Sequence, residues 1–86
     1  MMEISREEQK HFACEIINIS ERDTSPETLA SLLGIVTVFM SCVGKDNSIA
    51  INLSEYIYEL KQIAEGGEDT GWKDEFKSTL DKDLNS

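Results

Sequence analysis

The 86-residue sequence contains few basic residues, and this shortage limits the surfaces to which the chain can bind. Lys and Arg together number 8 against 17 Asp and Glu, which gives a formal net charge of −9 at pH 7. A surface for DNA or RNA needs an excess of cations that displace the counterions condensed on phosphate. Anionic membrane likewise attracts basic segments rather than acidic ones. We therefore expect no direct nucleic-acid binding and no membrane docking.

The chain also has little cysteine and no long apolar run. Two cysteines are too few for the disulfide scaffold of a small secreted domain. Cys14 and Cys42 each lie among apolar neighbours, so we expect small buried thiols in a reducing compartment. Whether their Cα atoms come within the roughly 7 Å that a disulfide requires is left open. The most apolar stretch, Leu29 to Val43, is shorter than the roughly 20 residues of a bilayer span. These features predict a cytoplasmic protein.

Motifs for catalysis or metal binding are lacking as well. His11 is the sole histidine, and no C-x-x-C or H-x-x-x-H spacing exists for a zinc site. A Cys14–His11 nucleophile and base would lack an orienting partner and an oxyanion loop. The glycine-rich segment 66–71 lacks the Lys-Ser/Thr ending of a phosphate-binding loop, and no EF-hand pattern occurs. We expect no enzymatic activity, no metal and no cofactor, with His11 on the surface or half-buried.

What the chain does contain is a set of clear helix signals. Ser5, with a glutamate three residues later, fits a capping box and predicts a helix from about Ser5 to Ser20. Ser25 can accept the free amides of a second helix, and Pro26 suits its first position. Gly44 supplies a left-handed stop for that helix.

The second half of the sequence predicts two more helices. Apolar residues at alternating spacings of four and three predict a helix from Ile49 to Ala64, with Gly66-Gly67 after it. A fourth helix is expected from Asp69 or Thr70 to about Leu84. Its apolar line consists of Trp72, Phe76, Leu80 and Leu84. With short turns and no linker, residues 1–86 are expected to form a single helical domain, a small antiparallel four-helix bundle.

The second helix has no polar face, which predicts that it lies in the middle of the bundle. An alternative exists for this region, because residues 35–39 are β-branched and aromatic and residues 48–52 alternate. Periodicity alone does not separate a buried strand from a buried helix. The alternative fold is therefore α+β, with a hairpin around residues 35–52.

Acidic residues are densest between positions 65 and 75. This window holds Glu65, Glu68, Asp69, Asp74 and Glu75 against Lys73 alone. One interpretation is an ordinary solvated surface. The other is an electrostatic docking face for a basic partner, which would speed association and mask the partner's own anion site. Trp72 is either a core anchor or an interface aromatic, and Tyr58 is a second candidate anchor.

A family resemblance lies in the segment from Asp69 to Lys82. It is similar to the last helix of colicin D-type immunity proteins through the matching residues Asp69, Gly71, Lys73, Glu75, Ser78, Leu80 and Lys82. Those proteins are small acidic helical bundles that bind and block a tRNA-cleaving bacteriocin domain. The resemblance covers about a sixth of the chain, and Met1 to Val43 show no such match. It implies a nuclease-inhibiting immunity role.

The sequence thus favours a non-enzymatic interaction protein. The leading hypothesis is an immunity protein that masks the active cleft of a cationic bacterial nuclease toxin. Its partner-binding residues would be Glu65, Glu68, Asp69, Trp72, Asp74, Glu75 and Tyr58. The alternative is a phage-encoded nucleic-acid mimic that inhibits a host defence nuclease, of the anti-CRISPR or anti-restriction type. A homodimeric bundle is a further interpretation, because the apolar second helix would gain burial from another copy.

Overall fold

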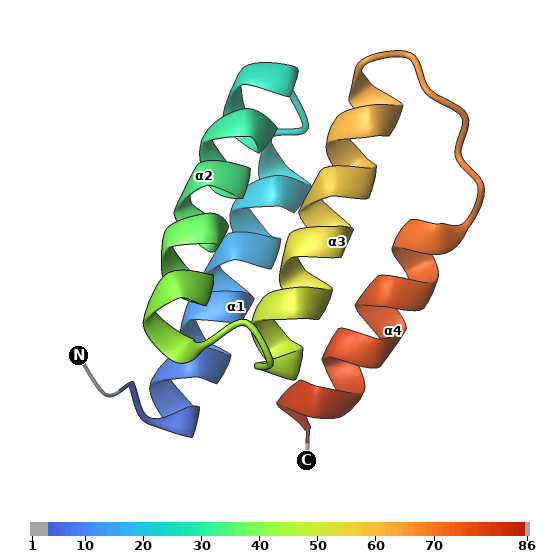
Figure 1. Cartoon of the computed structure of the whole chain (residues 1–86). Coiled ribbons are helices and arrows are strands. Elements are labelled where there is room, and N and C mark those ends of the chain that lie inside the picture. Colours follow the sequence, from blue (N-terminus) through green and yellow to red (C-terminus); the bar gives the residue numbers. More distant parts are fainter. Residues whose placement is uncertain (1–3, 86) are drawn as a thin grey trace.

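The computed structural model describes residues 4–85, which form four helices and, within that range, no strand (Figure 1). The helices are α1 (Arg6–Arg22), α2 (Pro26–Val43), α3 (Ser48–Ala64) and α4 (Trp72–Leu84). Successive helices run in opposite directions, so the predicted all-α antiparallel four-helix bundle is confirmed. The alternative hairpin around residues 35–52 is wrong, because this region is the end of α2, a turn and the start of α3.

Local capping explains where the helices begin and end. Ser5 accepts a hydrogen bond from the Glu8 amide at 3.2 Å. Ser25 caps α2 in the same way. Gly44, at φ 103°, ends α2 in a conformation that side chains with a Cβ rarely adopt. The fourth helix begins later than expected, after the left-handed Gly71, whose φ is 83°.

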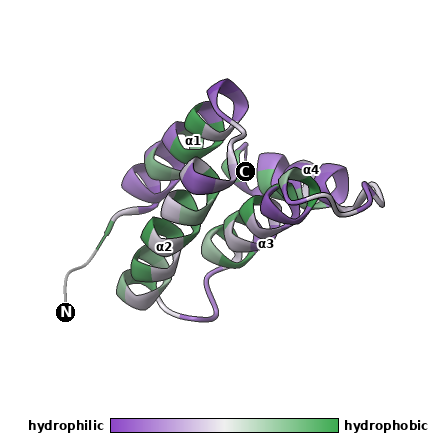
Figure 2. Cartoon of the chain, turned by 90° about the horizontal axis from the view of Figure 1, so that it is seen from above, coloured by the Kyte–Doolittle hydropathy of each residue, from purple (hydrophilic) through white to green (hydrophobic). Residues whose placement is uncertain are grey.

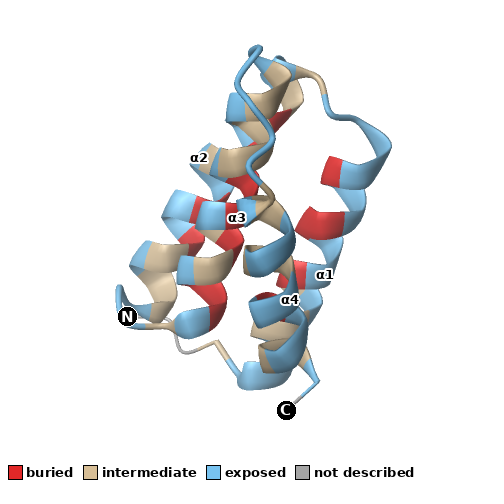
Figure 3. Ribbon diagram, turned by 90° about the vertical axis from the view of Figure 1, so that its right-hand side faces the viewer, coloured by how far each residue is buried: buried red, intermediate tan, exposed pale blue. Residues whose placement is uncertain are grey.

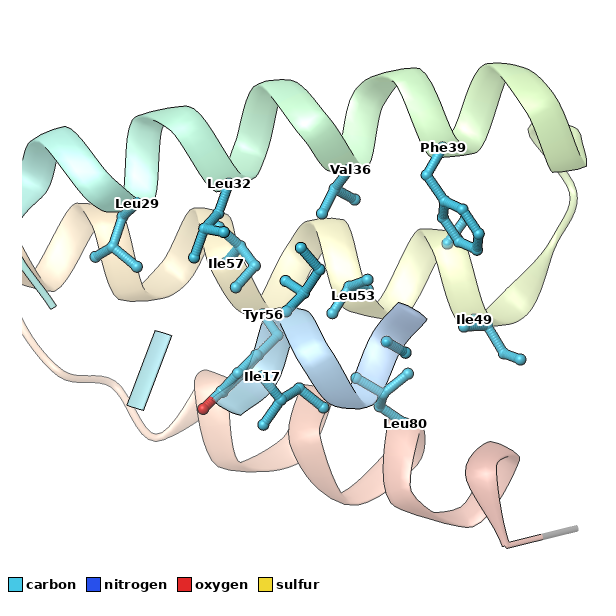
Figure 4. Close-up of a cluster of buried hydrophobic side chains, with 13 residues drawn as sticks. Ile17, Leu29, Leu32, Val36, Phe39, Ile49, Leu53, Tyr56, Ile57 and Leu80 are labelled. Carbon is cyan, nitrogen blue, oxygen red and sulfur yellow. The ribbon is translucent and has the colours of Figure 1, made fainter. Parts of the chain in front are cut away.

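The core is centred on α3, which packs against each of the other three helices. The buried residues of α3 are Ile49, Ala50, Leu53, Tyr56 and Ile57. Figure 4 shows side chains of α2 reaching down to this helix, while Leu80 of α4 approaches it from the other side. The apolar residues at spacings of four and three in this helix therefore form the central packing surface, as predicted.

The position expected for α2 is wrong, because α2 lies at an edge of the bundle (Figure 1). Only one stripe of it is buried, namely Leu29, Leu32, Val36 and Phe39. Ile35 is 48% exposed and Val38 is 65% exposed. The apolar composition of a helix determines which of its faces can be buried. The number of neighbouring helices determines how many of those faces are buried. By length and composition alone α2 could cross a membrane, and 22% of its residues are buried in this bundle.

The expectation of buried thiols is also wrong. Cys14 is exposed and Cys42 is half-buried, and both are free. Ala13 lies at the centre of the buried stripe of α1, so the next residue along the helix is turned about 100° away from it. An apolar neighbour in sequence is therefore a poor guide to burial on a helix.

Polar contacts attach α4 to the rest of the bundle. The Lys77 ammonium lies 2.9 Å from the Glu21 carboxylate of α1. The Asn52 amide of α3 donates a hydrogen bond to the Asp83 carboxylate at 3.3 Å. Beneath the first pair, Tyr56 is buried, and this burial raises the pKa of its hydroxyl. These contacts fix how α4 presents its outer surface.

The connection between α1 and α2 gives a pH-dependent prediction. The Asp23 carboxylate accepts hydrogen bonds from the Ser25 amide at 3.0 Å and the Thr28 hydroxyl at 2.7 Å. These bonds, the Ser25 amide foremost, lower the pKa of Asp23 below 3.8 in the folded chain. Because the folded pKa is depressed, this stabilisation is present above the unfolded value and is lost as pH falls through the folded pKa.

We therefore expect Asp23→Ala to lower the thermal midpoint at neutral pH and to have a shrinking effect below about pH 4. Thermal unfolding followed by circular dichroism across pH would show this. Asp46→Ala is the matched control, because within residues 4–85 the Asp46 side chain makes no hydrogen bond or ion pair. A constant difference between Asp23→Ala and wild type from pH 7 to pH 2 would contradict the assignment.

Candidate acidic interface

The predicted acidic residues do form one exposed stretch of surface. Glu65 caps the end of α3, residues 66–71 form the connection, and Asp74 and Glu75 lie in the first turn of α4. All five acidic residues of the window are exposed. Figure 3 shows pale blue, exposed backbone along this connection and along much of α4. We call the acids from Glu65 to Glu75, together with Trp72, the acidic face.

Two carboxylates of the acidic face are already paired within the chain. Glu65 forms an ion pair with Lys61 at 2.5 Å, and Asp69 lies 3.4 Å from Lys73. Asp69 also accepts a hydrogen bond from the Gly71 amide at 2.9 Å, which is the main cause of its lowered pKa. These two residues therefore shape the loop more than they offer charge to a partner.

The remaining three carboxylates are available. Within the described residues, the side chains of Glu68, Asp74 and Glu75 have no ion pair and no hydrogen bond. They project from the connection and from the N-terminal turn of α4. Carboxylates in a first helical turn are stabilised by the positive end of the helix dipole. The charge that a partner meets on this face therefore comes mainly from these three residues.

Trp72 is 58% exposed, so its interpretation as a core anchor is wrong. Residues four apart turn by about 40° around a helix, so a line at this spacing drifts by about 80° from Leu80 to Trp72. Leu80 is accordingly buried, Phe76 is half-buried and Trp72 faces solvent. The Trp72 ring lies edge-on to Phe76, with 6.4 Å between centroids and planes at 75°. This contact packs one edge of the exposed indole against Phe76 of the same helix.

Tyr58 does not belong to the acidic face. It is exposed and lines a shallow groove of about 350 Å³ between α2 and α3, together with Leu33, Thr37, Ser54 and Glu55. Trp72 lies on α4, which packs on the other side of α3. Six of the seven predicted partner-binding residues therefore lie between the end of α3 and the first turn of α4, whereas Tyr58 lies on the α2 side of α3.

A second acidic surface on α1 was not predicted. Glu7, Glu8, Glu15, His11 and Phe12 line an open cavity of about 410 Å³. Phe12 supplies apolar lining to this cavity and stacks on Phe39 of α2, with 4.3 Å between ring centroids. The spacing of these residues at three and four along one helix is the signal that could have found it. His11 is exposed, as expected, and its imidazole lies 3.9 Å from the Glu15 carboxylate.

Across residues 4–85, no three side chains of His, Cys, Asp or Glu are grouped so that they could hold a metal ion. The chemistry visible on the surface is therefore that of charge and of exposed aromatic and apolar side chains. Comparisons of the chain with protein families, with curated proteins and with solved structures found no match. The resemblance of the segment from Asp69 to Lys82 to immunity proteins accordingly stays a prediction.

Proposed function

We propose that this chain is a non-enzymatic inhibitor whose acidic face binds a basic protein and covers its active cleft. The partner that we propose is a bacterial nuclease toxin domain, for which the chain would act as the immunity protein. A nuclease cleft is lined by cations that bind phosphate, and a rigid surface of carboxylates competes for the same cations.

One observation carries the proposal: the exposed Trp72 lies in the same short stretch of chain, residues 68–75, as three exposed carboxylates that have no side-chain partner among the described residues. Glu68, Asp74 and Glu75 supply negative charge that no lysine of the described chain neutralises. Trp72 supplies a large apolar anchor, and tryptophan is enriched among residues that dominate binding energy at interfaces. Charge then directs the encounter, while the indole contributes affinity once the surfaces meet.

The net charge adds a kinetic argument. A chain of charge −9 is attracted over a distance of about a Debye length toward a cationic cleft. Such attraction raises association rates by about tenfold or more, and it weakens steeply as salt is added. An inhibitor that must reach a toxin before the toxin reaches nucleic acid benefits from this rate.

The test is a titration of the purified chain into the product of the neighbouring gene, which the proposal expects to be a nuclease, with RNA or DNA cleavage as the readout. We expect complete inhibition at equimolar ratio, and an affinity that falls as salt is raised from about 50 to about 200 mM. Cleavage that continues at saturating inhibitor would contradict the proposal. Inhibition of a host defence nuclease, with no effect on the neighbouring toxin, would instead support the nucleic-acid mimic.

A further inference from the structure

Trp72 occupies the first position of α4, directly after the left-handed Gly71. A helical side chain leans toward the N-terminus of its helix and packs over the preceding turn. No helical turn precedes Trp72, so the backbone of its own helix gives the indole no such support. α4 also lies at the edge of the bundle, with α3 as its main neighbour (Figure 2). The indole is accordingly exposed, and an exposed side chain without support changes rotamer within nanoseconds.

Phe76 supplies the support that the backbone does not. It lies one turn further along α4, on the side of the helix that it shares with Trp72. The two ring centroids are 6.4 Å apart and the ring planes stand at 75°, an edge-on arrangement that the charge distribution of aromatic rings favours. Phe76 is half-buried and packs against the buried core. One ring of the pair is therefore anchored in the bundle, while the other remains exposed.

We propose that Phe76 is a positioning residue, which holds the Trp72 indole of the free chain in the orientation that the basic partner receives. This inference rests on the proposed function, because it assigns Trp72 to the interface. Fixing a mobile side chain opposes association, and a side chain that is already held avoids this loss. Phe76 acts through Trp72 and needs no contact of its own with the partner.

This role determines how Phe76 affects the kinetics of binding. Phe76 carries no charge, so its replacement leaves unchanged the electrostatic attraction that sets the association rate. The contacts that form once the surfaces meet set the dissociation rate. Replacing Phe76 should therefore raise the dissociation rate alone, whereas neutralising the carboxylates of the acidic face should lower the association rate.

Time-resolved fluorescence anisotropy of the full chain tests the contact without a partner. Trp72 is the single tryptophan of the sequence, so the signal reports this side chain alone. We expect Phe76→Leu to raise the amplitude of the nanosecond component about twofold, and Phe76→Tyr, which keeps the ring, to retain the wild-type value. Far-UV circular dichroism checks that each variant is helical, and Phe76→Ile replaces Phe76→Leu if that variant unfolds.

Stopped-flow binding to the product of the neighbouring gene tests the positioning role. Phe76→Leu should raise the dissociation rate about three- to tenfold, as the loss of one aromatic pair predicts. Leu84→Ala is the matched control, because Leu84 is also half-buried against the core but lies about three turns from Trp72, and it should leave both rates unchanged. In a Trp72→Ala background, Phe76→Leu should have no further effect, because the residue through which it acts is gone.

Three results would overturn the inference. The first is equal mobility of the indole in wild type and in Phe76→Leu. The second is a dissociation rate that Phe76→Leu leaves unchanged, or that Leu84→Ala raises as much. The third is a full effect of Phe76→Leu in the Trp72→Ala background, which would indicate general destabilisation. A wild-type chain that does not bind the product of the neighbouring gene contradicts the proposed function instead, and the anisotropy then decides alone whether Phe76 holds the indole.

Discussion

Replacing Ile57 by alanine should lower the free energy of unfolding by about 3 kcal/mol. Ile57 is fully buried in α3, the helix on which the other three pack. The substitution removes three carbons from the centre of the core and leaves a cavity that the surrounding helices fill only in part. A small domain has a total stability of roughly 5–10 kcal/mol, so this single change would remove a large share of it.

Ile51→Ala is the matched control for this prediction. Ile51 lies on the same helix, six residues earlier, and is 39% exposed. Its truncation should cost less than about 1 kcal/mol, because it leaves no closed cavity and alanine favours the helix. Urea unfolding followed by circular dichroism gives both values. Equal losses for the two variants would contradict the central position of α3.

The sequence was most informative where local chemistry alone decides the structure. A hydroxyl at position 5 or 25 can satisfy the first amides of a helix, and Gly44 can adopt a positive φ without strain. These contacts join residues fewer than five positions apart. The expected bounds of α1 and α2 therefore lie close to the observed ones. The start of α4 was less predictable, because Asp69 bonds to the Gly71 amide instead of capping a helix at its own position.

The packing of α2 and the position of Trp72 could not be deduced in this way. Both depend on which helices are neighbours, and that is a property of the whole bundle. An apolar α2 predicted burial on all sides, but it packs mainly against α3 and α1, which cover only one side of it. Trp72 fitted an apolar line in sequence, although the drift of that line around the helix turns it to solvent.

The sequence predicted which acidic residues make up the candidate site. It did not predict which of them are paired with lysines. A dense run of acids on a chain with few cations has to be exposed, and the five acidic residues are exposed. Which acids remain free depends on lysines four positions away on the same helix or turn, as Lys61 and Lys73 show. Which acids have no partner within the described chain emerged only from the structure.

Neutralising the three free carboxylates of the acidic face should weaken binding to the proposed nuclease partner by about a hundredfold. The variant carries Glu68→Gln, Asp74→Asn and Glu75→Gln, each of which keeps the shape of the side chain and removes its charge. These groups have no partner within the described chain, so their loss breaks no internal ion pair. Most of the effect should fall on the association rate at low salt, and it should diminish as salt is added.

The matched control removes the same charge elsewhere, through Glu7→Gln, Glu27→Gln and Asp46→Asn. These three acids also lack side-chain partners among residues 4–85, and two of them lie in first helical turns, as do Asp74 and Glu75. Both triple variants carry the same net charge. A difference between them therefore reports the location of the charge and not its total.

The dissociation constants of these two triple variants for the proposed nuclease partner, measured by calorimetry at one salt concentration, test the account most directly. We expect the acidic-face triple to bind about a hundredfold more weakly than wild type and the control triple to stay within about threefold. Equal weakening by the two triples, or a larger loss in the control, would contradict the acidic face as the inhibitory surface.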